Sequence, residues 1–213
     1  MANLNTFFEI SRTIPGWRKD DAAKRLAQSS FELAGDPVIV EIGAFLGRST
    51  ILLAGARKLK GTGKVHVVDP FDCSGDLFSV PHYLQILASL GGGTLRDHFE
   101  ANIRLAEAEE WVEVHQARSR DAVANWRSAI DLLLLDGDTS PSGAREAYRD
   151  WSPFLKPNGV LAVSNSADRG YAEGHEGNRR VVEQEVIPPA YSDILCVGAV
   201  TFARKAAARL SEY

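Results

Sequence analysis

Cysteine is scarce in this chain of 213 residues, which contains only Cys73 and Cys196. Two cysteines so far apart in the sequence give no sign of a disulfide framework, and they lack the close spacing of a zinc cluster. We therefore expect free thiols in a reducing compartment and predict a cytoplasmic protein.

Long apolar runs and an excess of basic residues are also missing. Residues 1–10 lack the basic start and apolar core of a signal peptide, and no apolar run reaches the roughly 20 residues of a membrane-spanning helix. The net charge of -4 argues against nucleic acid or an anionic membrane as the main partner. Small molecules are the predicted partners.

The most informative stretch that is present covers residues 38–50, VIVEIGAFLGRST. A β-branched run leads to an acid, then to two glycines four residues apart, then to hydroxyl side chains that open a helical pattern. This order predicts a buried strand, a tight turn and a helix N-terminus. Glycines let the backbone approach a ligand, and the helix start offers unpaired N–H groups to an anion. S-adenosyl-L-methionine, which has a carboxylate and cationic groups, suits such a junction.

Apolar strands alternate with amphipathic helices along the rest of the chain. This alternation predicts an α/β fold with a single doubly wound, mostly parallel sheet that helices cover on both faces. The predicted strands are residues 38–42, 64–69, 111–115, 130–136 and 160–163, with a final β region at 193–203. The predicted helices are residues 3–14, 20–34, 48–60, 82–90, 94–108, 121–126, 142–154 and 179–186.

The first two helices precede the first predicted strand. We expect residues 1–36 to be an N-terminal helical extension that packs on the sheet, covers the ligand site or contacts a second copy in a homodimer. Residues 37–213 would then form the ligand-binding domain.

Polar residues follow four successive strands, at the sheet edge where doubly wound proteins bind ligands. Asp69 comes 26 residues after Gly43, where an acid can accept hydrogen bonds from ribose hydroxyls. Polar segments also follow the later strands, at residues 116–121, 136–139 and 164–166. Each acid could instead be a helix cap, and a glycine-rich turn alone is weak evidence. Their joint placement favours one ligand site.

At this point the sequence resembles a known family. The segments 40–49, 67–69, 130–138 and 155–161 are similar to those of class I S-adenosylmethionine-dependent O-methyltransferases. The similar branch is shared by catechol-type enzymes and small bacterial enzymes that methylate natural products, including macrolide sugars. The resemblance covers residues 37–204 and implies a Rossmann-like methyltransferase domain with activity in class EC 2.1.1.

The resemblance also implies roles for residues of the first turn. Glu41, with the turn around Gly43 and Gly47, would face the amino group of the methionine part. Ser49 and the backbone near Phe45 would hold its carboxylate.

Three further cofactor residues are implied at the later strand ends. Asp69 would bind the ribose and Ser119 would border the adenine. Asp136 would lie under the methionine part, beside the reacting centre.

The chain departs from the family where relatives bind a divalent cation. Relatives pair an acid at the Asp136 position with an Asp-Asn pair, which here reads Ser164-Asn165. Losing a carboxylate weakens a magnesium site, so Asp136 and Asn165 would form at most a degraded one, and the enzyme could work without metal. Asp138 could compensate. Thr139 stands where relatives carry Lys or His, and a threonine is no general base near neutral pH.

Candidate catalytic residues are Asp136 and two loop histidines, His82 and His175, which are predicted at the functional edge. A solvated surface position is the alternative for a loop histidine. His66 and His115 lie within predicted strands, where we expect packing roles.

Two other functions stay open. A protein that keeps the fold and the cofactor but has lost methyl transfer could act as a sensor or scaffold, as the changes at Thr139 and Ser164 suggest. A nicotinamide dehydrogenase is disfavoured, because the glycine spacing differs from G-x-G-x-x-G and a Tyr-x-x-x-Lys pair is missing near the fourth strand.

Overall fold

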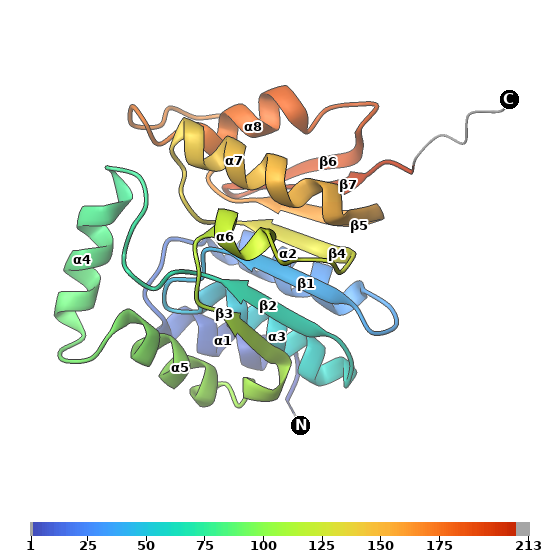
Figure 1. Cartoon of the computed structure of the whole chain (residues 1–213). Helices are drawn as coiled ribbons and strands as arrows, with labels where there is room; N and C mark the ends of the chain where they lie inside the picture. The colour runs from blue at the N-terminus through green and yellow to red at the C-terminus, as the bar shows by residue number, and fades with distance from the viewer. Residues whose placement is uncertain (1, 208–213) are drawn as a thin grey trace, which may run out of the picture.

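The computed structural model describes residues 2–207, in which seven strands form one sheet (Figure 1). The strand order is β3-β2-β1-β4-β5-β7-β6. Strands β1 to β5 pair in parallel, whereas β7 is antiparallel to both β5 and β6. The strands are β1 (Val38–Ile42), β2 (Lys64–Val68), β3 (Val112–His115), β4 (Ile130–Leu135), β5 (Leu155–Val163), β6 (Tyr191–Val197) and β7 (Val200–Lys205). The predicted doubly wound, mostly parallel sheet is confirmed.

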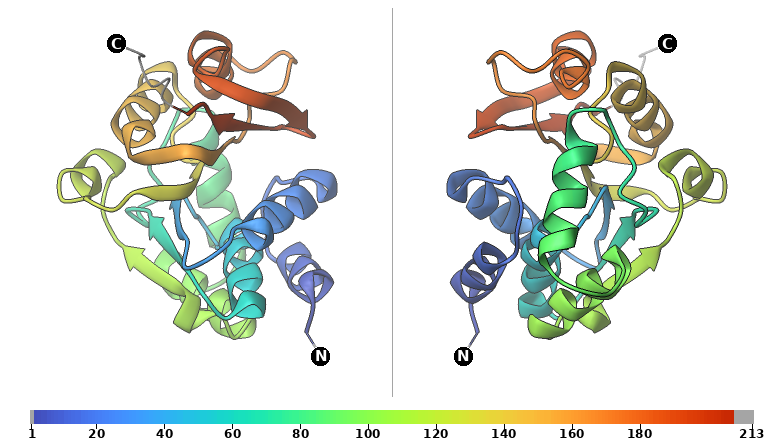
Figure 2. Two further views of the ribbon diagram at one scale, coloured as in Figure 1. Left: turned by 90° about the vertical axis from the view of Figure 1, so that its right-hand side faces the viewer. Right: turned by 90° about the vertical axis from the view of Figure 1, so that its left-hand side faces the viewer.

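Helices cover both faces of the sheet, as the side views show (Figure 2). One face carries α1 (Leu4–Thr13), α2 (Asp20–Glu32), α3 (Arg48–Lys60) and α5 (Leu95–Leu105). The other carries α6 (Ser119–Val123), α7 (Pro141–Trp151) and α8 (Gly177–Glu185). Helix α4 (Ser79–Ser89) stands away from the sheet near its carboxyl edge (Figure 1). Two short 3-10 helices are η1 (Glu109–Trp111) and η2 (Ser152–Phe154).

Alternation along the central strands builds two hydrophobic cores. In β1, Ile39 packs toward the core under α1, α2 and α3, whereas Val40 packs toward the core under α7 and α8. This period of two is the expected consequence of strand geometry, in which successive side chains point to opposite faces. Glu41 therefore points to the same face as Ile39, toward the start of α3, where Thr50 binds it.

Several element boundaries differ from the predicted ones. Residues 156–159, predicted as a connection, lie within β5, because Leu155 already pairs with Ile130 before the register shifts. Helix α4 begins at Ser79 and not at residue 82, since Asp76 accepts the backbone amides of Phe78 and Ser79. Asp76 was missed as a helix start signal.

Smaller differences concern the region around β3. Trp111, predicted to open this strand, belongs to η1, and the helix predicted at residues 121–126 is α6, which begins at Ser119 and ends at Val123.

The first two helices pack against α3. Gly55 of α3 lies under the ring of Phe7 from α1, and a Cβ at position 55 would lie 2.2 Å from the ring carbon Cγ of Phe7. Phe7 itself is buried. The ring of Phe7 in α1 therefore packs directly on Gly55, which lies inside α3, where alanine would normally be preferred.

Gly55→Ala should destabilise the protein by about 1–3 kcal/mol through overpacking, although alanine gains about 1 kcal/mol in helix propensity. Urea unfolding measures this change, and amide exchange should show the first helix opening more readily. Gly92→Ala is the control, because a Cβ there meets nothing within 4 Å. Unchanged stability of Gly55→Ala would refute the close packing of α1 on α3.

Candidate active site

Two adjoining cavities lie beyond the carboxyl ends of β1 and β4. Their volumes are about 330 and 340 Å³, within the usual range for small-molecule sites. Gly43, Phe45, Tyr83, Asp136 and Gly137 line both. The first cavity is bounded by residues 15–19, the start of α3, α4 and the end of β5, and the second by the loops after β2 and β3 and the start of α7. The carboxyl ends of the parallel strands meet at this edge of the sheet, where the sequence predicts the ligand site.

The turn after β1 depends on its glycines. Gly43 has a φ of +84°, and a Cβ there would lie 2.5 Å from the Cα of Gly137, in the loop after β4. Gly47 also has a left-handed φ, of +83°, immediately before α3. Position 43 needs glycine because the turn passes so close to the loop after β4, and position 47 because its backbone is left-handed at the start of α3.

Asp69 holds this turn closed. Its Oδ2 accepts the amides of Ala44 and Phe45 at 2.8 and 3.0 Å, and its Oδ1 accepts the amide of Phe71 at 2.7 Å. Burial raises the pKa of Asp69, and the amide hydrogen bonds oppose that rise. Asp69 lines the second cavity, but ribose binding stays a prediction, since its oxygens already accept backbone bonds.

Glu41 is fully buried beneath the same turn. Its Oε2 accepts a hydrogen bond from Thr50 Oγ1 at 2.6 Å, and its Oε1 has no partner among the described residues. Burial raises the pKa of Glu41 to about 8, against the lowering effect of the Thr50 hydroxyl. Glu41 lies behind the cavities and not on their walls, so its contact with the cofactor amino group stays a prediction.

Arg18, in the segment between α1 and α2, is a site residue that the sequence reasoning missed. Its Nε donates to Ser49 Oγ at 2.9 Å, and one terminal nitrogen donates to Asp136 Oδ2 and to Ser164 Oγ. The side chain is only 6% exposed. Nothing in residues 14–19 marks this arginine as different from a surface one, because its partners follow from the tertiary fold.

The arginine also bears on the predicted magnesium ligands. Arg18 forms an ion pair with the Asp136 carboxylate, the same group that would have to bind the magnesium ion. Burial raises the pKa of Asp136, and Arg18 opposes that rise. Asn165 lines the first cavity, but Asp138 accepts the amide of Ser140 at the start of α7 and is held there. A magnesium site at Asp136 and Asn165 stays a prediction, which the neighbouring guanidinium disfavours.

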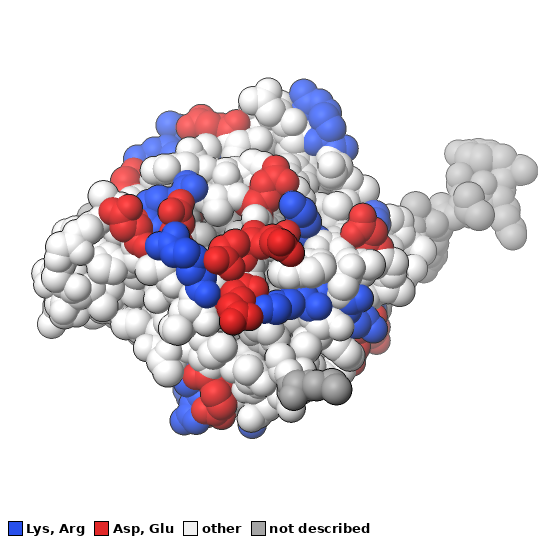
Figure 3. Space-filling model, turned by 90° about the horizontal axis from the view of Figure 1, so that it is seen from below, with Lys and Arg blue, Asp and Glu red and all other residues white. Residues whose placement is uncertain are grey.

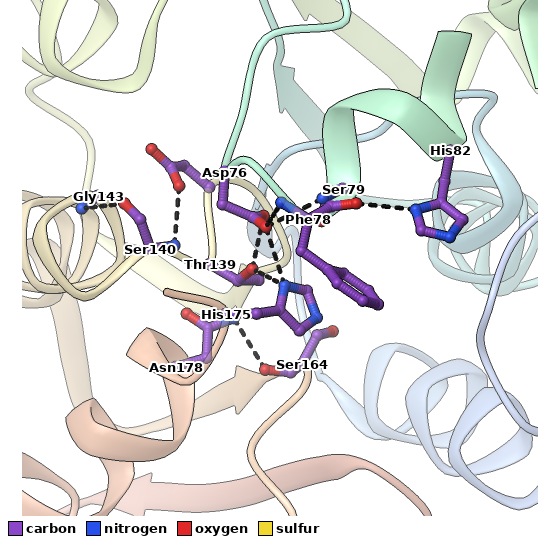
Figure 4. Close-up of polar contacts among 11 residues, drawn as sticks. Asp76, Phe78, Ser79, His82, Thr139, Ser140, Gly143, Ser164, His175 and Asn178 are labelled. Carbon is purple, nitrogen blue, oxygen red and sulfur yellow. Dashed lines mark hydrogen bonds and ion pairs between the residues drawn. The ribbon is translucent and has the colours of Figure 1, made fainter. Parts of the chain in front are cut away.

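His175 is joined to a buried acid on the wall of the first cavity (Figure 4). Its Nδ1 lies 2.6 Å from Thr139 Oγ1 and 3.1 Å from Asp76 Oδ1, and the Thr139 hydroxyl donates to Asp76 Oδ2 at 2.7 Å. Because the threonine proton goes to Asp76, the Thr139 oxygen is left to accept from Nδ1–H. The Asp76 side chain is 1% exposed. Burial alone would raise the pKa of Asp76, but hydrogen bonds, above all from Ser79 and Thr139, keep it below its ordinary value.

The other candidates have simpler surroundings. The prediction that His82 lies in a loop is wrong, because it belongs to α4. It lines the first cavity, and its Nδ1 donates to the carbonyl of Phe78, one turn earlier in the chain, at 2.8 Å. Ser119 Oγ accepts from Trp151 Nε1 at 2.8 Å on the border of the second cavity. Of the two predicted histidines, the structure connects His175 to a carboxylate and His82 to a carbonyl.

Three aromatic rings stand where the two cavities meet. The ring centroids of Phe45 and Tyr83 are 4.9 Å apart, and Trp17 lies 5.7 and 5.5 Å from them. Burial raises the pKa of Tyr83 well above its ordinary value, so this phenol stays neutral. The cluster joins the N-terminal segment, the β1 turn and α4.

The family model described as "Methyltransferase domain" matches residues 40–166, which is more than half of the chain. The chain belongs to this methyltransferase family. The matched range begins in β1 and ends after β5, so it contains the turn, Asp69 and Asp136. The predicted family is confirmed.

Solved structures share the fold of this methyltransferase. TomG, an O-methyltransferase from Streptomyces achromogenes solved in complex with SAM, is 18% identical, with a TM-score of 0.62 over 96% of this chain and 89% of its own. Cofactor-bound Rv0187 from MTB is 14% identical, with a TM-score of 0.65 over 95% and 88%. The O-methyltransferase NovP is 16% identical, with a TM-score of 0.64 over 87% and 79%. At these identities the likeness establishes the fold.

The raised pKa of Glu41 predicts a pH-dependent stability of the methyltransferase. Between the ordinary value of 4.5 and the folded value of about 8, the folded state binds more protons than the unfolded state. The free energy of unfolding should therefore fall as pH rises through this window, by at most about 1.4 kcal/mol per pH unit.

Glu41→Gln removes this titration. Urea unfolding at several pH values should show that the stability of wild type, relative to the variant, declines between about pH 5 and pH 8. Subtracting the unfolding free energy of the variant from that of wild type at each pH removes the contribution of groups that titrate alike in both proteins. Parallel curves for the two proteins would mean that Glu41 stays ionised in the fold.

Proposed function

We propose that this methyltransferase transfers a methyl group from S-adenosyl-L-methionine to a hydroxyl oxygen of a small molecule, without a metal ion. The observation that carries the proposal is His175, which lines the first cavity together with the β1 turn and Asp136 and is held by the buried carboxylate of Asp76. A base at that place suits an alcohol acceptor, whose oxygen must lose its proton.

The residues at the two cavities fit the cofactor. Its methionine part is a zwitterion, and Arg18 and Asp136 offer a cation and an anion side by side, with the Ser49 hydroxyl next to the guanidinium. We place the methionine carboxylate at Arg18 and Ser49. We place its amino group at Asp136 and not at Glu41, because Glu41 lies behind the cavities. Asp69 and Ser119 border the second cavity, which we assign to the adenosine part. When bound, the cofactor supplies an activated methyl group.

His175 acts as the general base. Its Nδ1–H faces Thr139 Oγ1 and Asp76, so in the neutral ring the Nε2 carries the free lone pair. Nε2 takes the proton of the acceptor hydroxyl, and the Asp76 carboxylate stabilises the imidazolium that results. Thr139, which is no base itself, accepts from Nδ1–H and fixes the ring orientation.

The surroundings of the first cavity suit a small molecule with an apolar body. Trp17, Phe78 and Tyr83 line it. Besides Arg18, the cations at its wall are Lys19, Arg48 and Arg169. No charged residue occurs between Asp76 and Arg96, the stretch that contains α4, and the corresponding left edge of the surface is uncharged (Figure 3). Elsewhere on that face acids and bases are interspersed, which supports a small molecule over a nucleic acid as acceptor.

In residues 2–207 no helix combines the length and apolarity needed to cross a membrane. A cytoplasmic location, a homodimer and the division of the chain at residue 37 stay predictions. A sensor or scaffold without methyl transfer is the alternative that the following experiments test.

His175→Gln should lower kcat by about 10²-fold or more, the usual contribution of a general base. Transfer of labelled methyl from the cofactor to a panel of hydroxylated small molecules, with and without chelator, measures the rate. The affinity for S-adenosylhomocysteine should stay within about twofold, because the base contacts the acceptor.

His82→Gln is the matched control and should retain most of the rate, while Asp76→Asn should fall between the two. Equal losses at His82 and His175 would remove the assigned base. Tight cofactor binding without transfer to any acceptor would favour the sensor.

Arg18→Gln should weaken binding of S-adenosylhomocysteine by about 10- to 100-fold, since a charge-assisted hydrogen bond contributes about 1.5–3 kcal/mol. Calorimetry measures the Kd. Arg12→Gln, which changes an exposed arginine at the end of α1, should leave it unchanged. If Arg18→Gln binds as wild type does, the arginine serves only to attach the N-terminal segment.

A further inference from the structure

Two histidines and a glutamate gather on the β2–β3 edge of the sheet, outside both cavities as the structure describes them. In the register of the two strands His66 is the partner of Glu113, and Val68 is the partner of His115. Glu113 and His115 are two residues apart on β3, so their side chains share one face of the sheet. His66 lies directly opposite Glu113 on β2, so its side chain points to that face as well. Their placement follows from strand pairing and not from a loop.

The distances among the three side chains match those of a metal site. His66 Nδ1 lies 3.1 Å from His115 Nε2, and one donor atom from each residue can be chosen so that all three lie within 4.8 Å of one another. The Glu113 carboxylate oxygens lie 3.7 Å from His66 Nδ1 and 3.6 Å from His115 Nε2. Two nitrogens bound tetrahedrally to Zn²⁺ at about 2.0–2.1 Å are about 3.3 Å apart, so an ion needs little rearrangement.

A rigid wall holds the two rings. His66 and His115 are stacked with centroids 5.4 Å apart, and both meet the ring of Trp126 edge-on, at 5.0 and 5.9 Å. Trp126 is buried and its Nε1 donates to the carbonyl of Ser128. On the outer side Glu113 is half exposed, which leaves a path for an ion and room for a water ligand.

We propose that His66, Glu113 and His115 bind one divalent transition-metal ion of the Zn²⁺ type, which links the edge strand β3 to β2. Two imidazoles and a carboxylate suit zinc and its neighbours, whereas Mg²⁺ and Ca²⁺ prefer an all-oxygen site. The proposal is independent of the proposed methyl transfer. It gives a metal-binding role to His66 and His115, for which the sequence predicts only packing.

The test uses the full-length chain without an affinity tag, in a buffer that does not bind metals. Calorimetry with ZnCl₂ should show one ion per chain, and Zn²⁺ should raise the Tm where MgCl₂ does not. His66→Gln and His115→Gln should each weaken Zn²⁺ binding by more than about tenfold, since changes to residues merely outside the ligand shell already cost that much. His82→Gln, which removes an exposed histidine on α4, should bind as wild type does.

Two measurements keep the outcome clear if a variant is unstable. Unfolding in the presence of chelator shows whether each variant is folded without metal, and only folded variants enter the comparison. Electron paramagnetic resonance of the Cu²⁺-loaded protein should show coupling to two imidazole nitrogens that is reduced in either histidine variant. Absence of Zn²⁺ binding, or binding and spectra unchanged in both variants, would overturn the proposal.

Discussion

A single buried carboxylate, Asp76, positions three parts of the active site at once. It accepts the backbone amides that start α4, the hydroxyl of Thr139 after β4 and the imidazole of His175 before α8. A buried carboxylate is costly unless several donors satisfy it, and the donors here come from elements far apart in the sequence. The same bonds that keep Asp76 ionised therefore hold the wall of the first cavity in shape and orient His175, the proposed base.

A second charged contact connects the N-terminal segment to the part of the site that we assign to the cofactor. Arg18 joins the segment between α1 and α2 to Ser49 in the first turn of α3, and to Asp136 and Ser164, which directly follow β4 and β5. The helices themselves pack on α3, so the extension both contributes to the core and brings a cation into the site. Arg18 thus places a positive charge against Asp136, the residue that the resemblance to catechol-type enzymes predicts as a metal ligand.

The sequence allowed the fold and one side of the site to be predicted, because both depend on local patterns. Strand alternation and the spacing of Gly43 and Gly47 are visible in the chain, and the carboxyl edge of a parallel sheet is where ligands bind. Arg18 and Asp76 were missed, since an arginine and an aspartate in loops acquire their roles only from tertiary contacts. The pairing of His66 with Glu113 likewise depends on strand register, which the sequence does not display.

The central claim is that Asp76 and Thr139 hold neutral His175 with its proton on Nδ1 and its Nε2 free for the acceptor. Long-range ¹H–¹⁵N correlation spectra of histidine-labelled protein report this tautomer directly, with the His175 signal assigned by its loss in His175→Gln. We expect a protonated Nδ1 and a bare Nε2. A ring protonated on Nε2 alone would contradict the account.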